Sequence, residues 1–83
     1  MMSNGSVDWV PLIGSVEVVV RQALPLSIHG DAYVDVLAAP EGAAASPFRI
    51  PAHQFGSLPI PGDRLRLHLL MSQVDRVERI DAP

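Results

Sequence analysis

The chain of 83 residues contains no cysteine and no lysine. Without cysteine there are no disulfide bonds, thiolate nucleophiles or cysteine-based zinc sites, so packing has to stabilise the fold. All six basic residues are arginines, and they stand against nine acidic residues for a formal charge of −3. Because phosphate binding depends on an excess of cations, this balance disfavours a general nucleic-acid binder.

Aromatic residues and long apolar runs are also scarce. The chain has one Trp, one Tyr and two Phe, and no apolar run approaches the roughly 20 residues that cross a bilayer. The first residues, MMSNGSVDW, lack the basic and apolar regions of a secretion signal. We therefore expect a cytoplasmic protein with no membrane partner.

What the chain does contain is aliphatic residues, since 48% of it is hydrophobic and 18% is charged. Such a chain is too apolar to be disordered, and its length suits one domain with a modest core. We expect a flexible N-terminus over residues 1–8 and a single β-barrel domain over residues 9–81. The aliphatic content is high for so small a core, which favours a surface that another subunit or partner covers.

Alternation of apolar and polar residues dominates the first part of the chain. Aliphatic residues at nearly every second position predict one long strand from Val16 to Ile28. Pro25 cannot donate to a ladder, so we expect a bend or bulge at Ala23 to Pro25. The turn residues His29-Gly30-Asp31 then predict an antiparallel hairpin with a second strand over residues 32–37.

The middle of the chain is less regular. Residues 38–47, AAPEGAAASP, are typical of a mobile loop. Phe48-Arg49-Ile50 restarts the alternation and predicts a short strand that Pro51 ends. We expect one helical turn around Ala52 to Phe55 before the chain becomes extended again.

The clearest pattern begins at the turn Pro61-Gly62-Asp63. Every second residue after it is a leucine as far as Leu69, and Arg64, Arg66 and His68 lie between the leucines. This pattern predicts a strand with one buried face and one basic, solvated face.

The end of the chain allows two interpretations. Its apolar residues predict a last strand with a bulge over residues 74–80. The same residues also fit helical spacing, with Asp63 as an N-cap, so an α+β fold with a C-terminal helix over residues 64–80 is an alternative. The alternation and the strands upstream favour the β interpretation.

Taken in order, these elements resemble a small five-stranded OB-fold-like barrel. The resemblance rests on the bent strand from Val16 to Ile28 and on the turn Pro61-Gly62-Asp63, which looks like the glycine-led start of the fourth strand in many such barrels. We therefore predict an all-β fold of this kind, and an SH3-like barrel is the nearest β alternative.

The resemblance implies a binding module, because OB folds often hold single-stranded nucleic acid or oligosaccharide on the face of strands two and three. Stacking on bases needs exposed aromatic side chains, and this chain has few of them. The residues at the corresponding positions here are Tyr33, Asp35, Arg49 and His53, with Phe48 or Phe55 as further candidates.

The outward residues Arg64, Arg66 and His68 form a basic stripe with two interpretations. The stripe can be an anion or phosphate track, extended on a neighbouring strand by Arg76 and Arg79. The favoured interpretation is a solvated strand face with cross-strand ion pairs. The acidic partners in that case are Glu17, Asp75 and Glu78.

Four aliphatic residues fall out of step with the alternation and are expected to point outward: Val19, Leu37, Leu70 and Met71. Exposed aliphatic side chains indicate an interface to another protein or to a second copy. The alternative is an error of register, or packing beneath the loop over residues 38–47.

Catalytic and metal-binding patterns do not stand out. His29, His53 and His68 lack the close spacing of a metal motif, and the serines form no G-x-S-x-G nucleophile elbow. Asp31 and Asp63 lie beside glycines and are better explained as turn formers. We expect no enzyme activity, no metal and no cofactor.

The sequence therefore predicts a non-catalytic binding module for another protein or for itself, with single-stranded nucleic-acid binding as the alternative. The predicted contact residues are Tyr33, Arg49, His53, Arg64, Arg66, His68 and Met71.

Overall fold

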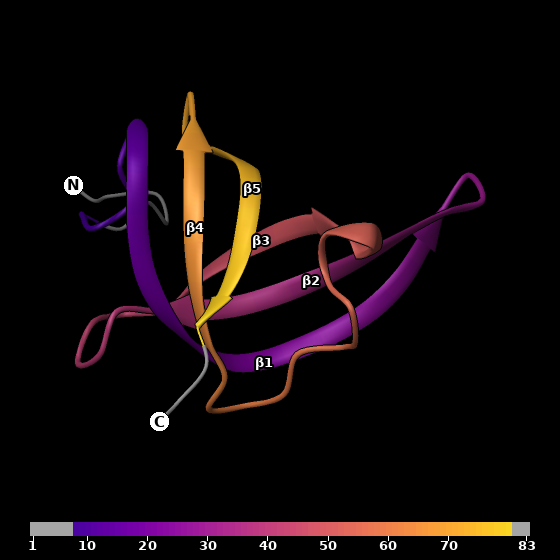
Figure 1. Cartoon of the computed structure of the whole chain (residues 1–83), viewed down its shortest axis with the longest axis horizontal. Helices are drawn as coiled ribbons and strands as arrows, with labels where there is room; N and C mark the ends of the chain where they lie inside the picture. The colour runs from indigo at the N-terminus through magenta and orange to yellow at the C-terminus, as the bar shows by residue number, and fades with distance from the viewer. Residues whose placement is uncertain (1–7, 81–83) are drawn as a thin grey trace, which may run out of the picture.

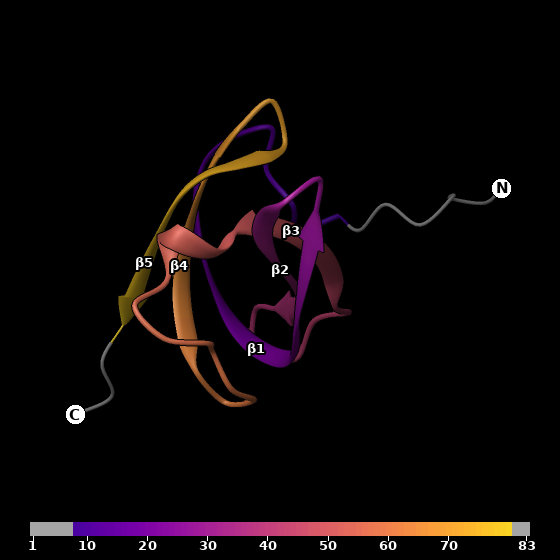
Figure 2. The ribbon, with the colours of Figure 1, turned by 90° about the vertical axis from the view of Figure 1, so that its right-hand side faces the viewer.

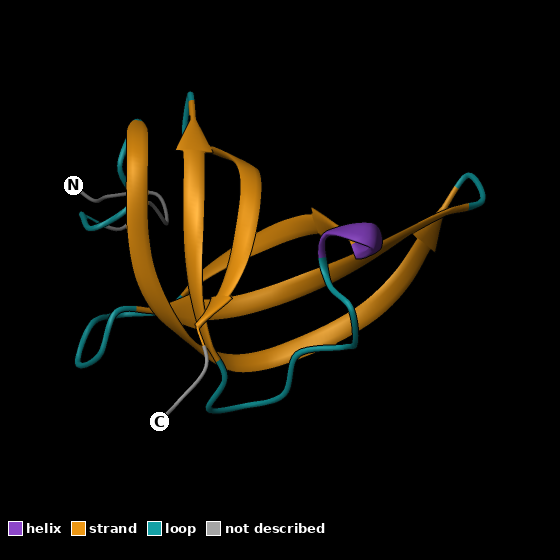
Figure 3. Ribbon diagram, in the orientation of Figure 1, coloured by secondary structure: helices purple, strands orange, loops and turns teal. Residues whose placement is uncertain are grey.

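The computed structural model of the protein describes residues 8–80, and these residues form an all-β fold, as predicted. Most of the predicted flexible N-terminus, and the predicted domain end at residue 81, lie outside this range. Figure 3 shows strands throughout and one short helical turn. The elements are β1 (Ile13–Ile28), β2 (Asp31–Ala39), β3 (Ser46–Pro51), the 3-10 helix η1 (Ala52–Gln54), β4 (Arg64–Leu70) and β5 (Gln73–Ile80).

The five strands form one antiparallel sheet in the order β3-β2-β1-β4-β5. The long strand β1 is strongly bent, so that its two ends serve different halves of the sheet (Figure 1). Its first half pairs with β4 and its second half with β2, and Val19 has a partner in each. Viewed from the side, the β4–β5 pair and the β2–β3 pair lie on opposite sides of the molecule (Figure 2).

The outer strands of the sheet are β3 and β5. Across residues 8–80 no ladder joins them, so the sheet curls toward a barrel without hydrogen-bonded closure. Closure would have removed both edges, whereas an open sheet keeps unpaired backbone groups on its outer strands.

The core lies between the two halves of the sheet. Alternate residues of β1, β2, β3 and β4 point into it because side chains in a strand alternate between faces. Ile50 and Leu65 are completely buried, and Trp9 and Val10 pack against the cluster from the chain that precedes β1. The buried members are Val18, Val20, Val34, Val36, Ala38, Phe48, Ile50, Leu65, Leu67 and Leu69.

The bulge in β1 is earlier than expected. The register with β2 shifts between Val20 and Gln22, which leaves Arg21 as the extra residue. The prediction of a bulge or bend at Ala23 to Pro25 was therefore wrong in position. Because one extra residue moves all later side chains to the opposite face, Leu24 lies outside the core with 54% of its surface exposed.

Two tight turns make the hairpins. His29 and Gly30 have φ of 51° and 85°, the combination that a type I′ turn requires, and they join β1 to β2 as predicted. Met71 and Ser72 also have positive φ, 55° and 62°, and join β4 to β5. Neither is a glycine, so this second turn is a less favourable one.

The C-terminal segment is a hairpin and not a helix. Leu65, Leu67 and Leu69 enter the core, which a strand allows and a helix over residues 64–80 does not. The predicted bulge in the last strand is confirmed, because Asp75 has no register partner on β4. The predicted helical turn after Pro51 is present as η1.

Candidate functional site

Arg64, Arg66 and His68 lie on the outward face of β4, as predicted, but they are not a free cationic track. The Nη2 atom of Arg66 donates to Oε2 of Glu17 on β1 at 2.8 Å. Its Nη1 atom lies 3.8 Å from Oε1 of Glu78 on β5. The hydrogen bond to Glu17 is the main reason that the pKa of Arg66 is raised. This side chain therefore bridges two carboxylates.

Glu78 is the centre of the polar network on this face. His68 Nε2 lies 3.0 Å from Oε1 of Glu78, and Arg76 Nη2 lies 3.6 Å from Oε2. The hydrogen bond from His68 is the largest cause of a lowered pKa of Glu78; partial desolvation opposes it, and the charge of Arg76 supports it. The stripe is therefore a solvated strand face with cross-strand ion pairs, the second of the two interpretations that the sequence allowed.

Arg64 is held more loosely than Arg66. Its Nη2 atom lies 4.0 Å from Oε1 of Glu41, and the Glu41 side chain is 84% exposed. Exposed pairs at this distance contribute little, because water and salt screen them. Arg64 is therefore the cation of the stripe that a ligand would engage most easily.

The other predicted cation, Arg49, is on β3 and is also paired. Its Nε and Nη2 atoms donate to the two carboxylate oxygens of Asp35 on β2, at 2.8 and 3.0 Å. This bidentate pair lowers the pKa of Asp35 and raises that of Arg49, in each case mainly through the hydrogen bonds. The pair is cross-strand, since Asp35 and Arg49 are register partners.

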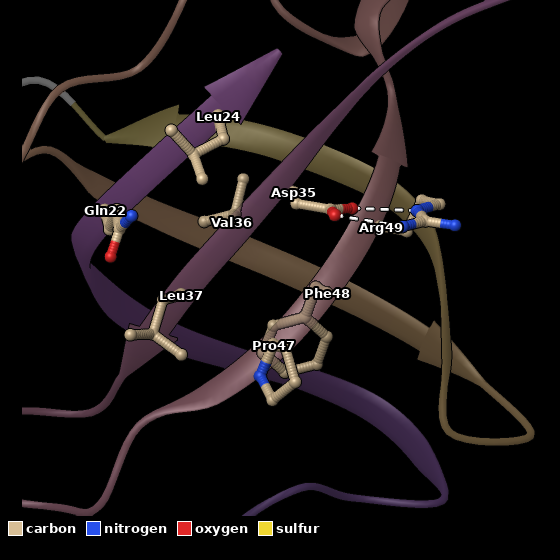
Figure 4. Close-up of a pocket in the computed structure, with 8 residues that line it drawn as sticks. All are labelled: Gln22, Leu24, Asp35, Val36, Leu37, Pro47, Phe48 and Arg49. Atoms are coloured by element: carbon tan, nitrogen blue, oxygen red, sulfur yellow. Dashed lines mark hydrogen bonds and ion pairs between the residues drawn. The ribbon is translucent and has the colours of Figure 1, made fainter. Parts of the chain in front are cut away.

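The Asp35–Arg49 pair borders a shallow depression of ≈ 420 Å³ on the outward face of β1, β2 and β3 (Figure 4). Leu24 reaches this depression only because of the bulge at Arg21, and its register partner on β2 is Asp35. The depression could offer a ligand apolar contacts and the side-chain amide of Gln22. Its two charged residues, Asp35 and Arg49, are already paired with each other. Its lining is Gln22, Leu24, Asp35, Val36, Leu37, Pro47, Phe48 and Arg49.

Two of the predicted contact residues, Tyr33 and Arg49, lie beside the same groove. Both line a groove of ≈ 440 Å³ between β3 and the start of β5. Tyr33 also lines an adjoining depression of ≈ 360 Å³ with His53. Phe48 is unsuited to stacking on a ligand, because it is buried and its ring lies 5.8 Å from that of Trp9.

Met71 belongs to a separate surface at one end of the molecule. It is 67% exposed at the tip of the β4–β5 hairpin, next to Leu70, which is 54% exposed. Leu70 is the register partner of Ile13, and the Ser72 amide donates to the Leu12 carbonyl at 2.8 Å. We call this surface the apolar end, and its residues are Leu12, Ile13, Leu70 and Met71.

The seven predicted contact residues therefore fall into three groups. The first group is Tyr33, Arg49 and His53 beside β2 and β3. The second is the stripe on β4, and the third is Met71. Sequence reasoning expected Leu70 and Met71 to point outward, and it did not assign Leu12 and Ile13 to a contact surface. A signal in the sequence could have indicated this: Leu12 and Ile13 are large apolar residues that precede the alternating strand pattern, so that pattern gives them no place in the core.

Two further kinds of feature are not found among residues 8–80. No three histidine or acidic side chains of this range gather to hold a metal ion. Within the same range, the chain contains no helix with the length and apolar character needed to cross a bilayer.

Comparisons with known proteins add no assignment. No protein family, curated protein or solved structure matches this chain. The apolar end and the paired polar face are therefore the two features of the molecule from which a function can be inferred.

Proposed function

We propose that this protein is a non-catalytic binding module that takes another protein at the apolar end. The observation that carries the proposal is the gathering of four exposed aliphatic side chains at one end of the sheet, each more than half exposed. Exposure of this much contiguous apolar surface is unfavourable for an isolated small domain and is typical of an interface.

The surroundings of the apolar end support a protein partner. Along the outward face of β1 and β4, the apolar pair Ile13 and Leu70 is followed by Ser15 and His68 and then by the ion pair of Glu17 and Arg66. An apolar centre with a polar, internally paired border matches the anatomy of protein–protein interfaces. Met71 suits such a centre because its flexible thioether adapts to different partner shapes.

An OB-fold-like architecture is part of the proposal. Its support is the bent β1 strand that pairs with both β2 and β4, and the outer position of β3 and β5. In such barrels, binding is a common use of the outer face and the hairpin loops. Fold alone does not assign function, so the apolar end carries the argument.

The test compares the affinity of two variants for a captured partner. Both variants replace an exposed leucine by serine, one at the apolar end and one on a different surface. Leu70 and Leu24 have the same exposed fraction, 54%, and lie on different surfaces. We expect Leu70→Ser to lose at least tenfold in affinity for a partner captured from the host and then purified, and Leu24→Ser to bind like the parent. The proposal is wrong if both variants bind equally well.

Single-stranded nucleic-acid binding is the second candidate. One observation favours it, namely that Tyr33 and Arg49 line the same groove beside the edge strand β3. A base that stacks on Tyr33 would place its phosphate near Arg49. Binding that weakens steeply between low and moderate salt, with amide shifts at these two residues, would favour this function over protein binding.

A further inference from the structure

Within residues 8–80, no strand is hydrogen-bonded to the edge of β5 that faces away from β4, although β3 lies near part of β5. One side chain occupies part of this edge. The Nε2 atom of Gln54 donates to the Asp75 carbonyl at 3.3 Å, and the Val77 amide donates to Oε1 of Gln54 at 3.3 Å. The side-chain amide of Gln54 thus stands where the backbone groups of a neighbouring strand would lie.

These two hydrogen bonds reveal the orientation of the edge. The Val77 amide and the Asp75 carbonyl point away from the β4 ladder, toward Gln54. In an antiparallel strand the amide and carbonyl of one residue point to the same side, so Val77 can form a hydrogen-bonded pair with a residue opposite it. Both hydrogen bonds to Gln54 are longer than the usual N–H···O distance of roughly 2.9–3.0 Å. The backbone of a neighbouring strand could therefore replace them with hydrogen bonds of ordinary length.

Charged residues at equal distances on the two sides of Val77 in β5 carry opposite charges. Arg76 and Glu78 flank it, and Asp75 and Arg79 flank these in turn. If a second β5 runs antiparallel with Val77 opposite Val77, Arg76 of each copy lies opposite Glu78 of the other, while Asp75, the bulged residue of β5, is left out of this pairing. The pairing of Arg76 with Glu78 occurs twice because of the two-fold symmetry, and both contacts join opposite charges.

We propose that β5 is a self-pairing edge, through which two copies of this chain join their sheets in antiparallel fashion about Val77. Gln54 is the residue that covers the edge in the single copy and leaves it on pairing. The partner is a second copy because the charge order of β5 is complementary to its own reverse. Opposite charges directly across a ladder stabilise a strand pair, whereas like charges destabilise it.

Two side chains of the single copy have to change their contacts for this pairing. The Gln54 amide must leave Asp75 and Val77, and Arg79 must give up its contacts with Ser57 and Asp63. Arg79 now donates to the Ser57 carbonyl and lies 3.8 Å from Oδ2 of Asp63. These contacts are side-chain interactions, so the exchange requires no change in the ladder between β4 and β5.

This pairing is independent of the proposed function. It uses the edge of β5, whereas the proposed protein partner uses the apolar end. Leu70→Ser is therefore expected to leave self-association unchanged, and the Gln54→Ala variant below is expected to leave partner capture unchanged. Failure of either proposal can be recognised without the other.

The decisive experiment is sedimentation equilibrium over a wide concentration range with two charge variants. Arg76→Glu places two acids at the paired positions, and Glu78→Arg places two arginines there. Each variant alone is expected to raise the dimer Kd by about tenfold or more, because a single substitution changes two contacts. A 1:1 mixture restores opposite charges at both positions and is expected to form the heterodimer.

The matched control uses another pair of opposite charges. Arg64 and Glu41 are loosely paired and lie outside β5, so Arg64→Glu and Glu41→Arg change the net charge equally without touching the edge. Neither control is expected to alter the dimer Kd, and their mixture is expected to behave like the parent. If Arg64→Glu and Glu41→Arg each weaken association as much as Arg76→Glu and Glu78→Arg do, and recover it on mixing, the proposal is overturned, since net charge would then explain both sets of variants.

Gln54 provides a second test that does not alter charge. Gln54→Ala uncovers the Asp75 carbonyl and the Val77 amide, so the dimer is expected to become tighter. Gln22→Ala removes an exposed glutamine elsewhere on the sheet and is expected to have no effect. A protein that stays monomeric at millimolar concentration both as the parent and as Gln54→Ala, with a folded amide spectrum, contradicts the proposal.

Discussion

The guanidinium of Arg66 and the carboxylate of Glu17 face each other across the β1–β4 ladder and share a hydrogen bond of 2.8 Å. Because of this contact, the basic stripe does not present Arg66 as a free cation. Arg66 lies between Glu17 and Glu78, so an incoming phosphate has to displace a carboxylate before it gains a cation. Paired cations release few counterions, and counterion release supplies most of the affinity of non-specific nucleic-acid binding.

The first prediction follows from this pairing. Neutralising both carboxylates in a Glu17→Gln, Glu78→Gln variant frees Arg66 and leaves His68 and Arg76 without their acidic partner. We expect this variant to gain weak, salt-sensitive binding to short single-stranded DNA in an amide NMR titration, while the parent protein shows none.

The control for this gain removes two acids that are outside the network. Asp8→Asn together with Asp31→Asn changes the net charge equally and leaves the stripe paired. If this control binds DNA as well as the Glu17→Gln, Glu78→Gln variant, net charge and not the release of Arg66 is the cause.

The second prediction concerns acid sensitivity at Glu78. The lowered pKa of this carboxyl, caused mainly by the hydrogen bond from His68, means that the folded state binds its proton less readily than the unfolded state. The resulting stabilisation is present above the ordinary value of 4.5 and is lost as the pH falls through the lowered pKa. Urea unfolding should show Glu78→Gln closer to the parent at pH 3 than at pH 7. A constant difference between the two proteins would contradict this.

The third prediction concerns the core. Ile50 is completely buried between the two halves of the sheet, whereas Leu24 is more than half exposed. We expect Ile50→Ala to lower the free energy of unfolding by about 2–5 kcal/mol, through lost burial and a residual cavity. Leu24→Ala is the control, with an expected change within about 0.5 kcal/mol. Similar losses for both variants would mean that the bulge at Arg21 is misplaced.

The fourth prediction separates binding from stability at Met71. Its φ of 55° favours glycine, so Met71→Gly relieves about 1 kcal/mol of backbone strain. The added freedom of glycine in the unfolded chain costs a similar amount, about 0.5–1 kcal/mol. We therefore expect thermal unfolding within a few degrees of the parent, together with weakened partner binding at the apolar end. Unchanged binding would exclude Met71 from the contact surface.

The strands could be predicted because their signals are local. The leucines of β4 alternate with charged residues within one short segment, and the turn at His29 and Gly30 needs only two adjacent residues with positive φ. These features depend on near neighbours in the chain, and the structure confirms them. The helix alternative for the C-terminal segment was wrong because spacing alone does not separate a bulged strand from a helix.

The bulge position could not be predicted in the same way, and the ion pairs could be predicted only as one of two interpretations of the stripe. Whether Arg21 or Pro25 interrupts the ladder depends on how β1 meets β2, and one residue of difference moves Leu24 from the core to the surface. The partners of Arg66 are 49 and 12 positions away in the sequence, on two different strands. Their proximity depends on the strand order, which no local pattern contains.

By itself the sequence predicted an all-β fold, with a C-terminal helix as the alternative, and indicated which side chains alternate into a core. The order of charges in β5, opposite in sign on the two sides of Val77, is also a property of the sequence alone. The tertiary structure decided that β5 is an outer strand, that Gln54 covers its edge, and that Leu12 and Ile13 join Leu70 and Met71. Alternation and turn geometry are properties of neighbouring residues, whereas edges, ion pairs and exposed patches arise only when distant strands take their places in one sheet.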